Sequence, residues 1–262
     1  MKIWIQSCSP LHHPTRNDYQ ESLKKHARKI ARPGTLFEFH GMDVQIPGMT
    51  TSHTGENVCG WQSVRNAIRA EKEGYDAFVM SSTFDSGYFG IHEMVDIPVV
   101  FITEACLHLA LMLGHKFAFV TINPFILARF EEISKQYGLA ERMVRGGCVD
   151  ITYARDFPIM FKEPAVYVDR MTKSIKEIVA RGADIIIPNP VPLSMFLLEQ
   201  GEREVDSARI LDTFACGFKM TELMVDLKES GMIRSKHGLF SAPPKELMPA
   251  LQKLYQVTFE ID

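Results

Sequence analysis

The sequence predicts an α/β protein of two pseudo-symmetric lobes, each built on a parallel sheet, with an active crevice between the lobes. Short apolar runs alternate with amphipathic stretches along the 262 residues, which is typical of parallel strands joined by helices. The halves also repeat, because Lys2–Ser7 is echoed by Lys116–Thr121 and Gly74–Met80 by Gly182–Pro188. Ligands of open parallel sheets bind outside the carboxyl ends of the strands, so facing lobes would line one crevice with two similar sets of loops.

In the first half, hydrophobic periodicity predicts four strands that each precede a helix. The first helix has the clearest pattern, since Leu23, Ala27 and Ile30 share one face and Pro33 follows its end. The expected strands are residues 2–7, 35–40, 76–80 and 98–102, and the expected helices are residues 18–31, 58–73, 89–94 and 105–113.

The second half repeats this alternation. Its expected strands are residues 116–121, 143–145, 184–187 and 209–211, and its expected helices are residues 124–137, 165–180, 193–200 and 213–229. We therefore expect lobe 1 to hold residues 1–113 and 213–231, and lobe 2 to hold residues 114–212. Residues 232–262 form an extension that caps the body or makes an oligomer contact.

Composition excludes several classes of function. The formal net charge of −3 leaves no basic surplus for a nucleic-acid partner. No apolar run approaches the ~20 residues of a membrane span, and the first residues do not resemble a secretory signal. We therefore expect a cytoplasmic protein, a homo-oligomer, with a small-molecule substrate and neither nucleic acid nor membrane as partner.

The five cysteines are an odd number without a C-x-x-C pair, which indicates free thiols rather than disulfides or a zinc site. Two of them follow predicted strands, namely Cys8 and Cys106. Cys106 would lie in the first turn of a helix, where backbone N–H groups can lower the pKa of a thiol.

The loop after the third strand, Ser81–Gly87, is dense in hydroxyl groups and carries one carboxylate. Its hydroxyl and backbone N–H groups can bind a carboxylate, while Asp85 accepts or moves a proton. The alternative is that Asp85 and Ser86 only cap the following helix. The matching second-half loop, Pro188–Pro192, holds three prolines, so that Asn189 is its only side-chain hydrogen-bonding group.

The spacing Asp76-Ala77-x-Val79-x-x-Ser82-x-x-Asp85-x-Gly87, followed by Val95–Val99 and Glu104-Ala105, resembles the Asp/Glu/hydantoin racemase superfamily, hydantoin-racemase-like branch. Gly182–Ile186 fits the equivalent place in the second lobe. The resemblance implies two α/β lobes, no cofactor, no metal, and proton transfer at a carbon next to a carbonyl or carboxylate. In the racemases this transfer uses one cysteine from each lobe.

This chain departs from the family pattern at both cysteine positions, where Ser82 and Pro190 stand. Serine without a partnered base is a far weaker base than a thiolate, and proline has no proton to exchange. A two-thiol racemase is therefore excluded. The superfamily also includes decarboxylases that keep one thiol, so we expect isomerase or lyase chemistry on a small carboxylate or cyclic amide with another acid/base set.

Asp85 is the leading catalytic candidate, followed by Ser82 and Glu104, although Glu104 at a helix start is equally expected as a cap. His12 and His13 could reach the crevice, whereas His40 and His53 lack the spacing of metal ligands. The expected substrate-binding residues lie in the loops after the strands of both lobes: Ser7, Cys8, Ser81, Thr83, Ser86, Thr121, Asn123 and Asn189.

Two alternatives remain open. The first is a noncatalytic small-molecule binder or sensor that kept the crevice and lost the thiols. The second is a hydrolase that uses Ser82, which is weaker because the chain has no G-x-S-x-G motif.

Overall fold

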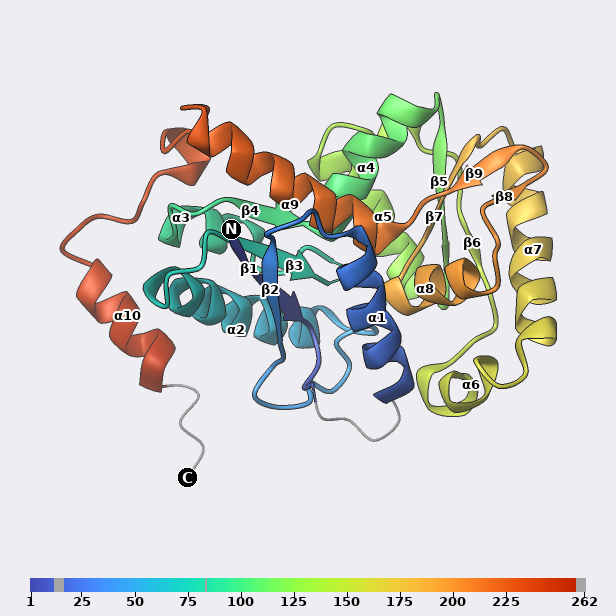
Figure 1. Ribbon diagram of the computed structural model, residues 1–262, viewed down its shortest axis with the longest axis horizontal. Helices are drawn as coiled ribbons and strands as arrows, with labels where there is room; N and C mark the ends of the chain where they lie inside the picture. The colour runs from blue at the N-terminus through green and yellow to red at the C-terminus, as the bar shows by residue number, and fades with distance from the viewer. Residues whose placement is uncertain (12–16, 83, 258–262) are drawn as a thin grey trace. The chain divides into compact units, whose positions relative to one another are not determined.

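The computed structural model describes residues 1–11, 17–82 and 84–257 (Figure 1). Contacts divide the chain into two compact units. Unit 1 comprises Met1–Leu11, Ala31–Phe101 and Phe218–Asp262, and unit 2 comprises His12–Ile30 and Ile102–Gly217. Each unit has its own sheet, so the predicted two-lobed α/β class is confirmed.

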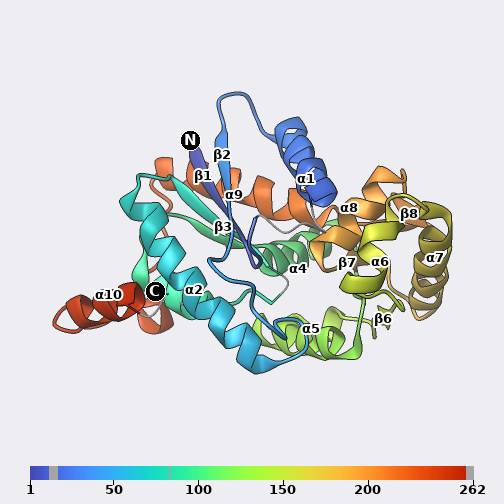
Figure 2. The ribbon, with the colours of Figure 1, turned by 90° about the horizontal axis from the view of Figure 1, so that it is seen from below.

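Unit 1 contains a four-stranded parallel sheet of order β2-β1-β3-β4. Its strands are β1 (Lys2–Ser7), β2 (Leu36–His40), β3 (Ala77–Ser81) and β4 (Val99–Phe101). Its helical elements are α2 (His53–Lys72), α3 (Tyr88–Met94), η2 (Gly238–Phe240), α10 (Met248–Val257) and most of α9 (Thr213–Glu229). Figure 2 shows α2 on one side of this sheet and α9 on the other.

The face of the unit 1 sheet toward α2 is set by strand alternation. Trp4 pairs with Phe78 and Gln6 with Met80 in the register of β1 and β3, and all four side chains are buried. Trp4, Phe78 and Met80 share one apolar cluster with Cys59 and other residues of α2. Packing of these large side chains against α2 fixes the register, since a shift by one residue would turn them to the opposite face of the sheet.

Unit 2 contains a five-stranded sheet of order β6-β5-β7-β9-β8, in which only β8 is antiparallel to its neighbour. Its strands are β5 (Phe117–Thr121), β6 (Gly147–Cys148), β7 (Ile185–Pro188), β8 (Glu204–Val205) and β9 (Ala208–Ile210). Its helices are α1 (Asn17–Ile30), α4 (Ile102–Leu113), α5 (Pro124–Gln136), η1 (Ala140–Arg142), α6 (Tyr153–Met160), α7 (Pro164–Ala180) and α8 (Val191–Glu199).

The unit boundaries differ from the lobes expected from sequence. Helices α1 and α4 belong to unit 2, whereas the residues after 231 belong to unit 1. In the latter segment Arg234 Nη1 lies 2.7 Å from His92 Nδ1, and Lys236 forms an ion pair of 2.9 Å with Asp96. Lys236 also donates to the main-chain oxygen of Val95, so the segment holds the carboxyl end of α3.

Several elements of unit 2 differ from the sequence prediction, among them the short strand β8 and the 3₁₀ helix η1, which were not predicted. The expected strand at residues 143–145 is wrong: Met143 makes only an isolated bridge with Phe117, and β6 begins at Gly147. Helix α6 was not predicted, because its segment of eight residues is short and contains a proline.

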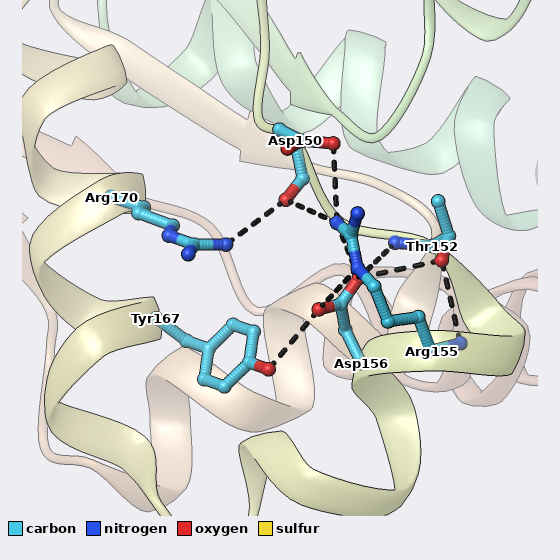
Figure 3. A network of polar contacts seen from close by, with 6 residues as sticks. All are labelled: Asp150, Thr152, Arg155, Asp156, Tyr167 and Arg170. Carbon is cyan, nitrogen blue, oxygen red and sulfur yellow. Dashed lines mark hydrogen bonds and ion pairs between the residues drawn. The ribbon is translucent and has the colours of Figure 1, made fainter.

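Tertiary contacts stabilise α6 instead. Thr152 caps the helix by accepting a hydrogen bond from the Arg155 N–H group, and Asp156 accepts from the N–H group of Thr152 and from the Tyr167 hydroxyl of α7 (Figure 3). Within the described part of the chain, no helix is long and apolar enough to cross a membrane.

Candidate active site

The carboxyl ends of β1 and β3 lie side by side in unit 1. Ser7 and Ser81 are paired at the last position of the register, and the Ser7 hydroxyl accepts a hydrogen bond of 3.2 Å from the N–H group of Ser9. The loops that follow the two strands therefore start next to each other, as the sequence predicts. Cys8 is half-buried against the apolar cluster of this unit.

Ser82 is enclosed by the protein. Its exposed fraction is 1%, and its hydroxyl group has no hydrogen-bond partner within the described residues. A hydroxyl group buried without a partner costs free energy, so such groups often mark a place for a ligand or an ordered water. A nucleophilic serine would need a base within hydrogen-bond reach, and none is bonded to Ser82 in the described chain.

Asp85 follows in the same loop and is 4% exposed. Its backbone φ of 50° lies in the left-handed region, which few residues other than glycine and asparagine or aspartate adopt. The N-cap position of α3 is held by Gly87, which has no side chain to cap the helix. The N-cap residue is therefore neither Asp85 nor Ser86.

In unit 2 the candidate residues gather at the carboxyl ends of β5 and β7. Val120 pairs with Pro188, so Thr121 and Asn189 come next on adjacent strands, and the N–H group of Asn189 donates to the oxygen of Val120. Both side chains are fully buried. The Thr121 hydroxyl and the Asn189 Oδ1 atom have no hydrogen-bond partner within the part of the chain that the structure describes.

Two further buried threonines, which the sequence did not single out, lie in unit 2. Asn189 Nδ2 donates to the hydroxyl of Thr103 at 3.4 Å, and the Thr213 hydroxyl is a further buried group without a partner in the described ranges. Thr103 lies in the first turn of α4 and Thr213 begins α9. The signal that could have found them is the internal repeat, since each threonine closely follows the fourth strand of its half.

Other predicted site residues have more ordinary surroundings. Asn123 is the N-cap of α5, where its Oδ1 accepts a hydrogen bond of 2.8 Å from the N–H group of Ile126. Glu104 is half-buried in the first turn of α4, which belongs to unit 2. Thr83, His12 and His13 lie outside the described residues.

All five cysteines lie within the described residues, and none forms a disulfide bond. The prediction that Cys106 lies in the first turn of a helix is wrong, because α4 begins at Ile102 and Cys106 is fully buried, with its thiol 3.7 Å from the Thr213 oxygen. Burial raises the pKa of the Cys59 thiol far above its usual range. These two thiols are therefore unlike the exposed, activated thiol of a catalytic site.

His40 contributes to packing. Its ring stacks on Trp4 with centroids 3.3 Å apart, and its Nε2 lies 3.1 Å from the Tyr75 hydroxyl. Burial lowers the pKa of His40. No group of three or more histidine, cysteine, aspartate or glutamate side chains within residues 1–11, 17–82 and 84–257 is arranged to hold a metal ion.

Comparison with known proteins identifies relatives that match most of the chain. The Asp/Glu/hydantoin racemase family matches residues 13–221. A hydantoin racemase of Pseudomonas sp. (strain NS671) is 28% identical over 215 residues, which are 82% of this chain and 77% of that protein.

Solved structures agree with this match. An allantoin racemase from Klebsiella pneumoniae is 22% identical and superposes with a TM-score of 0.76, covering 94% of each chain. An allantoin racemase from Pseudomonas fluorescens is 21% identical with a TM-score of 0.72, covering 94% of this chain and 98% of that one. At these identities the likeness establishes the shared fold.

Proposed function

The chain belongs to the Asp/Glu/hydantoin racemase family, and from this premise we propose that it transfers a proton at a carbon next to a carbonyl or carboxylate group. The resemblance drawn from the sequence is confirmed at the level of the family, and with it an enzyme of the isomerase class. The finer proposal is an isomerase or lyase that needs no cofactor and acts on a small carboxylate or cyclic amide.

The observation that carries the finer proposal is the buried polar loop after β3. Ser82, Asp85 and Ser86 are each at most 4% exposed. Burial of three polar side chains in one short loop costs free energy, which a purely structural loop would avoid by using apolar residues. The loop also holds Asp85 in a backbone conformation that few residues adopt, and such conformations are concentrated at functional sites.

In the proposed reaction the Asp85 carboxylate removes the proton from the carbon. The negative charge then moves to the neighbouring carbonyl oxygen, where hydroxyl and backbone N–H donors of the substrate site stabilise it. Return of a proton to the carbon, from Asp85 or from solvent, completes an isomerisation. In a lyase CO₂ leaves first, and protonated Asp85 gives its proton to the carbon. Aspartate serves as the base in enolisation on another scaffold, so a thiolate is not required for this step. Ser82 would act as a donor to the substrate rather than as a base.

Unit 2 has buried polar groups of its own at adjacent strand ends, the Thr121 hydroxyl and the Asn189 amide. We assign the Thr121 hydroxyl, which can donate, to a substrate carbonyl or carboxylate, and the Asn189 Oδ1 atom, which accepts, to a substrate N–H group. Ser7, Cys8, Ser81 and Ser86 are further candidates in unit 1. Glu104 remains a candidate acid because it is half-buried and not fully enclosed.

A noncatalytic binder is the second candidate function. It is supported by the sequence resemblance, which places Ser82 and Pro190 at the positions of the family's catalytic cysteines. Proline at the second position cannot return a proton to the opposite face of the substrate, so a binder or a one-sided lyase would account for it.

Proton exchange in D₂O tests the proposal whichever product the reaction forms. The protein is incubated with enantiopure 5-benzylhydantoin, allantoin, aspartate, glutamate and phenylmalonate, and deuterium incorporation, optical rotation and CO₂ release are followed. We expect exchange or CO₂ release with at least one compound, abolished in Asp85→Asn. Binding of a compound, seen as a shift in melting temperature, without any exchange or CO₂ release would favour the noncatalytic binder.

A further inference from the structure

Gln62 is a buried polar side chain that the proposed reaction does not use. It is fully buried in α2, and neither its Nε2 nor its Oε1 atom has a hydrogen-bond partner within the described chain. A primary amide can make several hydrogen bonds, and leaving all of them unmade in the protein interior is costly. Gln62 therefore requires an explanation that packing alone does not give.

Asn66, one helical turn further along α2, shows where this face of the helix points. Its Nδ2 donates a hydrogen bond of 3.0 Å to Oε1 of Gln6 in β1, which also accepts from Trp4 Nε1. Residues four apart lie on the same face of a helix, so Gln62 also faces the sheet. The two amides differ in that Asn66 has a partner in the sheet and Gln62 has none within the described chain.

Gln62 lies level with the ends of the strands. Helix α2 runs antiparallel to β3, because the chain passes from its end at Lys72 directly to the start of β3 at Ala77. Moving from Asn66 back to Gln62 advances about 6 Å toward the carboxyl ends of the strands. Two residues along a strand cover about the same distance. The residues that face Gln62 from the sheet are therefore the one two positions after Gln6 and the one two positions after Met80.

These residues are Cys8 and Ser82. Every second residue of a strand points to the same face. Cys8 therefore follows Trp4 and Gln6, and Ser82 follows Phe78 and Met80, on the face toward α2. Cys59, one turn before Gln62 in α2, supports this placement. Its neighbours include Cys8 and Ser86, which both influence the pKa of its thiol. The Gln62 amide and the Ser82 hydroxyl, both without a partner among the described residues, thus belong to the same place in unit 1.

We propose that Gln62 is a specificity-determining residue that binds the amide edge of the substrate beside Ser82. A cyclic amide presents an N–H donor next to a carbonyl acceptor, which together satisfy both Oε1 and Nε2 of Gln62. A carboxylate offers only acceptors and would leave Oε1 without a partner. A site built to make a hydrogen bond discriminates strongly against a ligand that cannot make it.

This inference rests on the proposed function, and a matched pair of ligands separates the two. 5-Benzylhydantoin carries the cyclic amide edge, and benzylsuccinate, an open-chain dicarboxylate of similar size, carries carboxylates and no N–H group. Allantoin and dihydrouracil extend the panel of cyclic amides. Binding is measured by calorimetry and proton exchange by NMR for the wild type, Gln62→Met and the control Asn66→Met.

We expect Gln62→Met to weaken binding of the cyclic amide by about tenfold or more, the effect of losing about one to two hydrogen bonds. Its melting temperature should stay the same or rise, because methionine removes an unsatisfied amide. Asn66→Met should show the reverse: a lower melting temperature, since Gln6 loses a partner, and unchanged affinity per folded molecule.

Several results would overturn the inference. Equal affinity of the wild type and Gln62→Met for the cyclic amides, or preference of the wild type for the carboxylate, would do so while leaving the proposed function intact. Loss of the fold in both Gln62→Met and Gln62→Leu would show that the amide has a structural role only. A wild type that responds to none of the probes, in the panel here or in the proton-exchange test, would refute the proposed function and the inference together.

Discussion

The backbones of Gly60 in α2 and Gly87 in the loop after β3 are in direct contact. A Cβ atom on Gly60 would lie 2.9 Å from the Gly87 nitrogen, and one on Gly87 would lie 2.8 Å from the Gly60 oxygen. Gly87 also has a φ of 85°, which favours glycine. The contact fixes the end of the Ser82–Gly87 loop against α2, so the position of Asp85 depends on two residues without side chains.

Gly60→Ala should therefore disturb the loop. Alanine in a helix interior is normally more favourable than glycine by about 1 kcal/mol. Here we expect the opposite, a loss of about 1–3 kcal/mol in the free energy of unfolding, because the Gly87 backbone must move. Urea unfolding measures the change, and turnover should fall with it.

Gly90→Ala is the matched control, since Gly90 also lies in a helix and its Cβ would meet only the Cγ2 methyl group of Val64 at 3.0 Å. We expect a smaller loss there. A Gly60→Ala protein that is more stable than the wild type would show that the loop does not depend on this contact.

Asp85→Asn should reduce turnover by about two orders of magnitude or more, the usual contribution of one general acid–base group. Asparagine has the same shape and tolerates a left-handed backbone, so the fold should be retained. The control is Asp76→Asn, an exposed aspartate that accepts a hydrogen bond from the N–H group of Lys2. Comparable turnover in the two variants would remove Asp85 from the catalytic role.

Alkylation of the cysteines other than Cys8, which lies in the proposed substrate site, should leave turnover largely intact. Cys59, Cys106 and Cys216 are buried, and partial burial raises the pKa of the exposed Cys148 thiol, which lowers its reactivity near neutral pH. Mass spectrometry after alkylation identifies the modified residues. Cys8→Ser and Cys106→Ala, assayed separately, complete the test: an inactive but folded variant of either would show that the chemistry uses a relocated thiol.

His92 should make the protein less stable in acid. Burial, together with the neighbouring charges of Arg234 and Lys236, lowers the pKa of His92 to about 3, from 6.5 for an unperturbed histidine. The unfolded chain therefore binds a proton that the folded protein does not accept, and stability falls as the pH falls from about 6.5 toward 3. The slope from this residue is at most about 1.4 kcal/mol per pH unit.

Urea unfolding of the wild type and His92→Gln at pH 7, 5.5 and 4.5 measures this effect. The variant keeps a polar side chain but cannot titrate, so its stability should fall less steeply with acid. Parallel curves for the two proteins would show that His92 is not responsible.

Asp156 should contribute more to stability than Asp150, although both pair with Arg155. Asp156 is 3% exposed, and this burial by itself raises the pKa of its carboxyl group. Hydrogen bonds from Arg155, Thr152 and Tyr167 outweigh burial and hold the pKa below the usual value (Figure 3). The Asp150 side chain is 82% exposed. We expect Asp156→Ala to lower the free energy of unfolding by about 1–3 kcal/mol, and Asp150→Ala by less than about 0.5 kcal/mol. Equal losses, measured by urea unfolding, would contradict this account of how α6 is held.

The sequence alone determined the alternation of strands and helices, the two-lobed class, the family and the polar loop after β3. These features are local or repetitive: a buried strand needs an apolar run, a surface helix needs an amphipathic period, and a duplicated half carries both at the same spacing. The repeat also aligned Thr121 and Asn189 with the ends of neighbouring strands, which the register of β5 and β7 confirms.

Tertiary structure decided what each polar residue does. Nothing in the sequence distinguishes Gln62 from Asn66, because both are amides on one face of α2, and only the position of Gln6 in β1 gives one of them a partner. Likewise α6 is stabilised by the hydrogen bonds that Asp156 accepts from Tyr167 and Thr152. Such contacts join residues that are distant in sequence or held by weak local preferences, so their energies appear only when the chain is folded.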